Sequence, residues 1–401
     1  MNTIEGGVAA PIGFTASGVA AAIKPNTTKR DCALVVSASD ASVAGTFTQN
    51  IMRSPPVYWN QDICAKGHAR AVFLNSGNAN AVTGEQGHDD VRTTANRVAE
   101  KLDVAVEEVC ICSTGIIGLP LPMDRIIAGV DDAAAALSRE GGLAAAEAIM
   151  TTDTVAKEIA VELKCSTGTV RIGAIAKGSG MIAPNMATMI CILTTDAAIE
   201  PTVLRSLVQK RVAESFNSIT IDNDMSTSDT VLCLANGESG VRIHEDAPSD
   251  YAIFQEAFQH VCESMAKELV KDGEGATKLV EIRVEQAPSD EAARTVARSI
   301  ANSMLCKTAF FGEDANWGRI ACAAGYAGVP FDPFSLAIWL DDVQLVTGGM
   351  PSGYQEDDAA AVMKQESFTV RVALGAGSGT AVFWTSDLSH GYVTINADYR
   401  T

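Results

Sequence analysis

The sequence KGSGMIAPNMATMICILTTD, from Lys177 to Asp196, decides how the centre of this protein is built. The apolar run Met189–Leu193 is typical of a strand that is buried on both faces. Two glycines and a proline precede this run and predict a tight loop. A threonine, Thr188, therefore stands at the entry to a core strand, and the small residue Ala187 comes directly before it.

A hydroxyl group at this position can reach the carbonyl carbon of the residue before it. This arrangement suits self-cleavage of the Ala187–Thr188 bond by an N→O acyl shift. Cleavage leaves Thr188 with a free α-amine, whose reference pKa of about 7.7–8.0 lets it act as a general base. Threonine activated by its own amine is an established nucleophile. The residues alone leave a second interpretation open, in which PNMATM is only a loop that enters a core strand.

Seven runs of sequence resemble one protein family. KGSGMIAPNMATM closely resembles the processing-site motif of the glutamate N-acetyltransferase/ornithine acetyltransferase family of arginine biosynthesis. The other runs follow in family order, and the resemblance covers nearly the whole chain: LNSGNANAVTGEQG (Leu74–Gly87), CSTGIIGLPLPMDRI (Cys112–Ile126), IMTTDTVAK (Ile149–Lys157), DGEGATK (Asp272–Lys278), KTAFFGEDANWGRI (Lys307–Ile320) and NADYRT (Asn396–Thr401). The resemblance implies that Thr188 is both the cleavage residue and the nucleophile that carries the acetyl group.

Acyl transfer also needs donors for the oxyanion of the tetrahedral intermediate. Ser113–Gly115 looks like a strand end followed by a glycine turn, which can present the Thr114 hydroxyl and the Gly115 N–H together. The residues alone do not separate this role from that of a plain turn. The resemblance implies that Thr114 and Gly115 form the oxyanion hole.

Substrate recognition requires groups for a carboxylate and an amine. Lys177 is the cation of the processing motif and is expected to bind a substrate carboxylate, with a solvated surface lysine as the alternative. Glu274 lies in a glycine-flanked loop, and the resemblance implies that it orients the Thr188 amine or a substrate amine. One of Thr151 and Thr152 is expected to line the pocket, and the sequence leaves open which. The predicted substrate-binding residues are Thr151, Thr152, Lys177, Thr188, Glu274, Asn396 and Thr401.

No metal site is predicted. Asp222–Ser226 opens like a calcium loop, but Thr227 stands where such a loop needs glycine and Cys233 where it needs glutamate. A structural or substrate-adjacent loop is expected there. The five histidines and ten cysteines are scattered, and the cysteines are expected to be buried, reduced thiols. No cofactor is expected, and the sequence leaves open whether acetyl-CoA is a second acetyl donor.

Composition excludes several classes of protein. The 401 residues carry a net charge of −19, which argues against binding nucleic acid or anionic membranes. No apolar run approaches the roughly 20 residues of a membrane-spanning helix, and the first residues lack the basic region of a secretory signal. Together with the reduced cysteines, this predicts a cytoplasmic protein.

Strands and helices alternate along the chain and predict an α/β layered sandwich, αββα-like, with central sheets flanked by helices. Self-cleavage is expected to give chains 1–187 and 188–401 that share one core, with a smaller C-terminal α/β unit from near Ser289. The expected strands are Cys32–Ala38, Arg70–Asn75, Val109–Gly115, Val170–Gly178, Met189–Ala197, Ser218–Asp222, Thr230–Gly237, Leu279–Gln286, Leu336–Leu340, Phe368–Leu374, Gly379–Ser389 and Tyr392–Arg400. The expected helices are Asp89–Leu102, Pro201–Phe216, Ser249–Gly273 and Ser289–Leu305.

The function implied by the resemblance is transfer of acetyl from N2-acetylornithine to glutamate through an acetyl-Thr188 intermediate, with ping-pong kinetics. The implied partners are the two fragments of the precursor, assembled as a heterotetramer with two of each. One alternative is an N-terminal-threonine amidase or aminopeptidase of a related self-processing fold. Another is a non-catalytic binding protein, which would not cleave itself.

Overall fold

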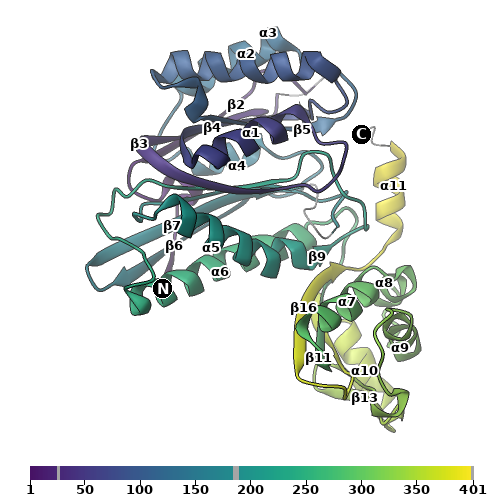
Figure 1. Cartoon of the computed structure of the whole chain (residues 1–401). Helices are drawn as coiled ribbons and strands as arrows, with labels where there is room; N and C mark the ends of the chain where they lie inside the picture. Colours follow the sequence, from purple (N-terminus) through teal and green to yellow (C-terminus); the bar gives the residue numbers. More distant parts are fainter. Residues whose placement is uncertain (25–27, 184–188, 399–401) are drawn as a thin grey trace.

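The chain builds two mixed sheets, of nine and seven strands, within residues 1–24, 28–183 and 189–398, which the computed structural model describes (Figure 1). In pairing order, the nine-stranded sheet contains β1 (Asn2–Ile4), β6 (Lys157–Cys165), β7 (Gly168–Lys177), β8 (Ile190–Thr195), β10 (Thr230–Ala235), β3 (Cys32–Phe47), β4 (His68–Asn78) and β5 (Val109–Ile116), with β2 (Phe14–Val19) beside β3. The seven-stranded sheet contains β14 (Met350–Pro351), β13 (Val343–Thr347), β12 (Ala337–Leu340), β15 (Ser367–Ala373), β11 (Leu279–Ala287), β16 (Gly379–Ser386) and β9 (Ile219–Thr220).

Helices cover both sheets. The α-helices are α1 (Pro55–Lys66), α2 (Gly84–Leu102), α3 (Met123–Ala135), α4 (Gly142–Ala148), α5 (Pro201–Glu214), α6 (Pro248–Lys271), α7 (Asp290–Ala301), α8 (Met304–Phe311), α9 (Trp317–Gly325), α10 (Glu356–Met363) and α11 (His390–Asp398). Short 3₁₀ turns are η1 (Gly7–Ala9), η2 (Val106–Glu108), η3 (Phe216–Ser218) and η4 (Pro333–Ser335).

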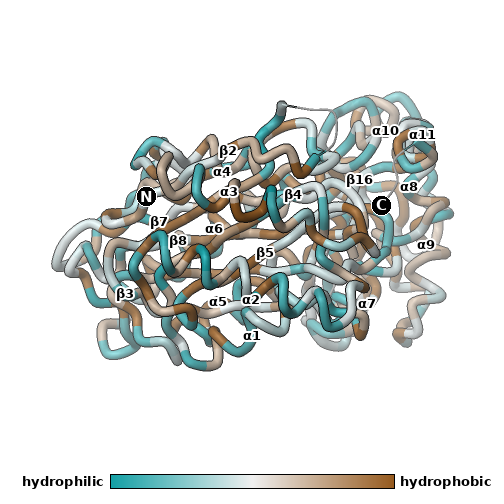
Figure 2. Tube along the Cα trace, turned by 90° about the horizontal axis from the view of Figure 1, so that it is seen from above, coloured by the Kyte–Doolittle hydropathy of each residue, from teal (hydrophilic) through white to brown (hydrophobic). Residues whose placement is uncertain are grey.

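The large sheet forms the layered core expected from the sequence. Its β2–β5 half packs against α2 and α3, and its β6–β8 and β10 half packs against α5 and α6 (Figure 1). A third cluster fills the space between the two halves and includes residues of α1 and α4. Figure 2 shows hydrophobic residues following the strands through the interior. The αββα-like sandwich is therefore confirmed.

Strand β8 is buried on both faces, as predicted. Side chains alternate along a strand. Ile190 and Ile192 therefore point into the third cluster, between the two halves of the sheet, and Cys191 and Leu193 point toward α5 and α6. Burial of each large aliphatic side chain stabilises the fold by about 1.5–3 kcal/mol. The strand runs antiparallel to β7 and parallel to β10, with Ile190 opposite Lys177 on one side and Thr230 on the other. The start of β8 is thus fixed between two neighbours.

The seven-stranded sheet forms a smaller unit with α7–α10 (Figure 1). Its strand β11 begins at Leu279, upstream of the start expected near Ser289. Ser289 caps α7, since its hydroxyl accepts a hydrogen bond from the Ala292 N–H at 3.2 Å. The long helix expected to continue to Leu305 is interrupted, because Ser303 caps a second helix, α8.

The strand expected over Tyr392–Arg400 is wrong within its described part, which forms helix α11 instead. The β-branched residues there favour a strand, but none of the helix residues is buried and no sheet edge pairs with them. Local hydrogen bonds decide the outcome: the Gly391 N–H donates to Ser389 Oγ and the Thr394 hydroxyl to the His390 carbonyl.

The expectation that all cysteines are buried is also wrong, since Cys322 is exposed and Cys165 is half-buried. Across the described segments, no helix has the length and apolarity needed to cross a membrane.

Candidate active site

A cavity of about 120 Å³ opens beside the start of β8. Every predicted site residue that the structure describes lines it. Ala187, Thr188 and Thr401 lie outside the described residues. The lining residues are Ala79, Thr114, Gly115, Ile117, Thr151, Thr152, Lys177, Gly180, Met181, Asp222, Asp224, Ser226, Thr227, Ser228, Glu274, Tyr392 and Asn396.

Thr114 and Gly115 come from the end of β5, where its pairing with β4 becomes irregular at Asn78. Gly115 has a φ of +129°, and a Cβ there would lie 2.4 Å from the carbonyl carbon of Gly77. Only glycine fits, because such a contact is shorter than any real Cβ contact. The glycine turn expected from the sequence is therefore part of the strand itself, and the close approach holds Thr114 and Gly115 at the cavity wall.

Lys177 is buried, so the alternative of a solvated surface lysine is wrong. Its Nζ donates a hydrogen bond to Thr114 Oγ1 at 3.4 Å. Burial lowers the pKa of Lys177, and the nearby carboxylate of Asp153 opposes that shift. The ammonium group thus lies beside the predicted oxyanion donor.

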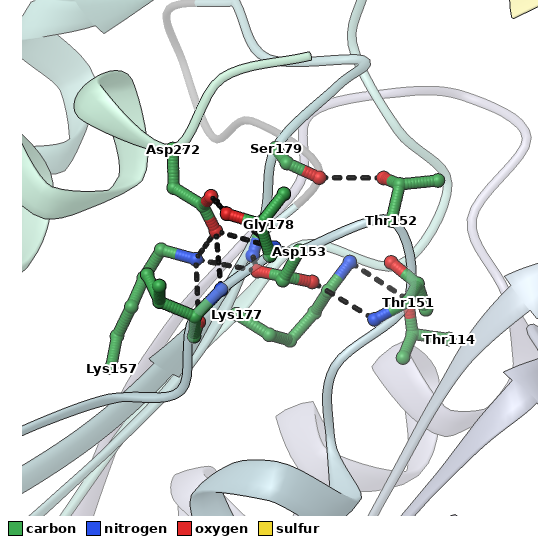
Figure 3. A network of polar contacts seen from close by, with 11 residues as sticks. Thr114, Thr151, Thr152, Asp153, Lys157, Lys177, Gly178, Ser179 and Asp272 are labelled. Carbon is green, nitrogen blue, oxygen red and sulfur yellow. Dashed lines mark hydrogen bonds and ion pairs between the residues drawn. The ribbon is translucent and has the colours of Figure 1, made fainter. Parts of the chain in front are cut away.

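Asp153, which was not among the predicted site residues, holds this side of the site together (Figure 3). Its Oδ1 accepts hydrogen bonds from Lys157 Nζ at 2.8 Å and the Gly178 N–H at 2.7 Å, and its Oδ2 accepts one from the Thr151 N–H at 2.9 Å. Burial raises the pKa of Asp153, but Lys177 and Lys157 outweigh it and lower the pKa to about 2. Its position inside the quoted block IMTTDTVAK was the available signal.

Both candidate threonines reach the cavity. Thr151 is fixed through its backbone by Asp153, and Thr152 Oγ1 lies 2.5 Å from Ser179 Oγ. Figure 3 shows the threonines on one side of this network, with Lys157 and Asp272 on the other. The network ties the turn that follows α4 to the end of β7.

Glu274 enters the cavity from the loop after α6. Its N–H donates to the Ser179 carbonyl at 2.6 Å, and its Oε2 accepts a hydrogen bond from Asn396 Nδ2 at 2.8 Å. A Cβ on Gly180 would lie 2.4 Å from this carboxylate, so the glycine makes room for it. Asp387 holds the same loop by accepting hydrogen bonds from the Thr277 N–H and hydroxyl.

The loop predicted to be structural or substrate-adjacent supplies Asp222 and Asp224 to the wall. Asp222 accepts hydrogen bonds from the N–H groups of Met181 and Ile182 at 2.6 and 2.8 Å, and from the Tyr392 hydroxyl at 3.2 Å. Burial raises the pKa of Asp222, against these hydrogen bonds. Sequence reasoning missed Tyr392 because α11 was expected to be a strand. No group of three or more His, Cys, Asp and Glu side chains in the described part is placed to hold a metal ion.

The geometry defines a class of protein: a layered α/β protein whose site combines a hydroxyl, a glycine N–H, a buried lysine and a carboxylate at the entry to a core strand. Those groups match the needs of acyl transfer. The model of the ArgJ family matches residues 15–401, and the chain belongs to that family.

Individual relatives agree over the full length. The chain is 47% identical over 402 residues to the arginine biosynthesis bifunctional protein ArgJ of Symbiobacterium thermophilum, covering 100% of both. It is 45% identical to the protein of that name from Parasynechococcus marenigrum, covering 99% of this chain and 96% of the relative. A crystal structure of the arginine biosynthesis bifunctional protein argJ from Bacillus halodurans is 39% identical with a TM-score of 0.50, and the match covers 51% of this chain and 97% of that chain.

Proposed function

We propose that this chain is a glutamate N-acetyltransferase of arginine biosynthesis, which moves an acetyl group from N2-acetylornithine to glutamate through acetyl-Thr188. Membership of the ArgJ family, whose curated relatives align over their full length, supports an acyltransferase of this pathway. One observation carries the proposal: every predicted site residue within the described ranges lines one cavity at the start of β8.

The first half-reaction acylates the threonine. Thr188 Oγ bonds to the acetyl carbon of N-acetylornithine, the carbon–nitrogen bond breaks, and the hydroxyl proton leaves with the ornithine amine. The Thr114 hydroxyl and Gly115 N–H stabilise the oxyanion, at about 3–4 kcal/mol for a single donor. Lys177, which donates to Thr114 Oγ1, polarises that hydroxyl as a donor.

The second half-reaction returns the acetyl group to an amine. The glutamate nitrogen attacks the ester carbon, the bond to Thr188 Oγ breaks, and a proton moves from the nitrogen to the oxygen. In this proposal Glu274 holds the amine, and the 2.8 Å hydrogen bond from Asn396 Nδ2, which orients the carboxylate, supports that role. Lys177 offers the positive charge for a substrate carboxylate, and Asp153 stays ionised beside it because of its low pKa. The two steps balance with no cofactor.

Self-cleavage into 1–187 and 188–401 belongs to the same proposal. Strands β8 and β10 of the second fragment lie between β7 and β3 of the first, so the fragments stay joined by one sheet after the cut. The match to the Bacillus halodurans structure covers 97% of that solved chain but only 51% of this chain, as expected if the solved chain is one of two fragments. A heterotetramer of two α and two β fragments in the cytoplasm completes the proposal, and native mass spectrometry tests the assembly.

Acetyl-CoA is proposed as a second donor, supported by the word bifunctional in the relatives' names. The competing functions are an amidase, in which water replaces glutamate, and a silent binding protein.

Intact mass spectrometry separates the alternatives. With N-acetylornithine and no glutamate, the fragment that starts at Thr188 should gain the mass of one acetyl group. Addition of glutamate should remove that mass and form N-acetylglutamate. Water competes at high concentration, but a positioned amine has an effective molarity of about 10⁵–10⁸ M. Equal acetate release with and without glutamate would establish the amidase, and an unmodified, uncut chain would establish the binding protein.

A further inference from the structure

Asp229 is a fully buried carboxyl group beside the start of β8, and nothing in the transfer mechanism uses it. It directly precedes β10, whose first residue, Thr230, lies opposite Ile190 in the parallel pair. Its backbone carbonyl accepts a hydrogen bond at 3.0 Å from the N–H of Thr48, the residue directly after β3. Asp229 is therefore held rigidly at the entry to the strand that follows the cleavage bond.

The two oxygens of this carboxyl group have different surroundings. Oδ1 accepts a hydrogen bond from the Met189 N–H at 3.2 Å. Oδ2 is buried and receives no hydrogen bond from any residue in the described ranges. A buried polar atom without a partner is costly, and such an atom in a native structure calls for an explanation.

Burial raises the pKa of Asp229 well above its usual range. The Met189 N–H, the hydroxyls of Thr48 and Ser226 and the Lys177 ammonium oppose the shift without cancelling it. The Thr48 hydroxyl donates to the Ser226 carbonyl at 2.7 Å, and Oδ2 itself has no hydrogen-bond partner within the described ranges. The raised pKa favours the neutral acid, which avoids the cost of a buried charge, and the unpartnered oxygen can carry its proton.

Chain connectivity relates the carboxyl group to the cleavage bond, because the Met189 N–H that donates to its Oδ1 belongs to the residue directly after Thr188. The nitrogen of Met189 is bonded to the carbonyl carbon of residue 188, so the backbone of a single residue separates it from the nitrogen of residue 188. That nitrogen is the leaving group when the Ala187–Thr188 bond breaks, and it needs a proton to leave as an amine.

We propose that Asp229 supplies the proton to the nitrogen of residue 188 during self-cleavage, an inference that rests on the cleavage in the proposed function. The Thr188 Oγ–carbon bond forms and the carbon–nitrogen bond breaks. Asp229 gives its proton to the nitrogen, and the proton lost by Oγ restores the acid. Water then hydrolyses the ester and releases fragment 1–187. Asp229 thus serves the maturation of the site.

The test follows cleavage of freshly translated chain over time on denaturing gels. Asp229→Asn keeps an oxygen that accepts the Met189 N–H but removes the acidic proton. Loss of a general acid typically costs 10²–10⁴-fold, so cleavage should slow by about a hundredfold or more. The matched control is Asp196→Asn after the other end of β8. Asp196 is also buried and accepts hydrogen bonds from the Arg171 and Ile12 N–H groups, and its variant should cleave at the wild-type rate.

Hydroxylamine, which cleaves esters, separates the proposed role from a role in hydrolysis. It should not restore cleavage of Asp229→Asn, because little ester forms; restoration would overturn the inference. Equal rates for Asp229→Asn and wild type would overturn it while leaving the proposed function intact. An uncut wild-type chain would overturn both. If Asp229→Asn does not fold, Asp229→Glu and Asp229→Gln replace it: the acid should cleave at least tenfold faster than the amide, and equal rates would refute the proposal.

Discussion

Replacement of Thr114 by alanine is the most direct test of how the site stabilises charge. The change removes the hydroxyl that lies at the cavity wall and accepts the Lys177 hydrogen bond at 3.4 Å. Thr114 is 4% exposed, so bulk water has little room to replace the lost donor.

The expected magnitude follows from this burial. Removal of one oxyanion donor costs about 2.7–4 kcal/mol in other acyl-transfer enzymes, which is roughly a 10²–10³-fold drop in kcat. KM should change much less, because the donor acts mainly in the transition state. Thr114→Ser keeps the hydroxyl and should retain most of the activity.

The assay is steady-state formation of N-acetylglutamate from N-acetylornithine and glutamate, using fully processed protein. Thr194→Ala is the matched control: Thr194 is buried and its hydroxyl donates to the Val8 carbonyl, but it does not line the cavity. Its variant should lose stability, by roughly 1 kcal/mol for the hydrogen bond, and keep its kcat. A Thr114→Ala enzyme with normal kcat and raised KM would refute the oxyanion role and place Thr114 in ground-state binding.

Three further predictions address cleavage, the acceptor and pH. Thr188→Ala should remain one full-length chain on a denaturing gel and Thr188→Ser should still process; a cut at the same bond in Thr188→Ala would contradict the acyl shift. Glu274→Gln should slow the transfer of acetyl from Thr188 to glutamate more than it slows acylation of Thr188. Intact mass spectrometry of samples quenched at successive times measures both rates. Equal slowing of the two steps would place Glu274 outside acceptor binding. The pKa of Asp153, lowered to about 2, adds stability that is complete above its unfolded pKa of about 4 and is lost as pH falls toward 2. Asp153→Asn should therefore lower the free energy of unfolding at pH 7 by roughly 2 kcal/mol, measured by urea unfolding. The difference from the wild type should narrow at pH 3. A difference that does not change with pH would count against the ion pair between Asp153 and Lys157.

Local sequence patterns correctly predicted the helices and strands whose tertiary contacts agree with the local preference. The apolar run at Met189–Leu193 became a fully buried strand, because hydrophobicity without alternation already requires cover on both faces. Ser289 became a helix cap, because its hydrogen bond reaches only three residues along the chain. The strand prediction failed at Tyr392–Asp398, which belongs to helix α11, because a strand needs a sheet edge and none pairs with these residues.

The amino-acid sequence by itself determined the family, the central strand and the identity of the candidate groups, because motifs and burial patterns are read along the chain. Only the tertiary structure decided that Thr114, Lys177, Glu274 and Asn396 line one cavity, because these residues are distant in sequence and meet through strand pairing and loop packing. Folding also set the charge environment. Burial and neighbouring charges act through space, so the lowered pKa of Lys177 and the raised pKa of Asp229 arise only once the sheet closes around β8.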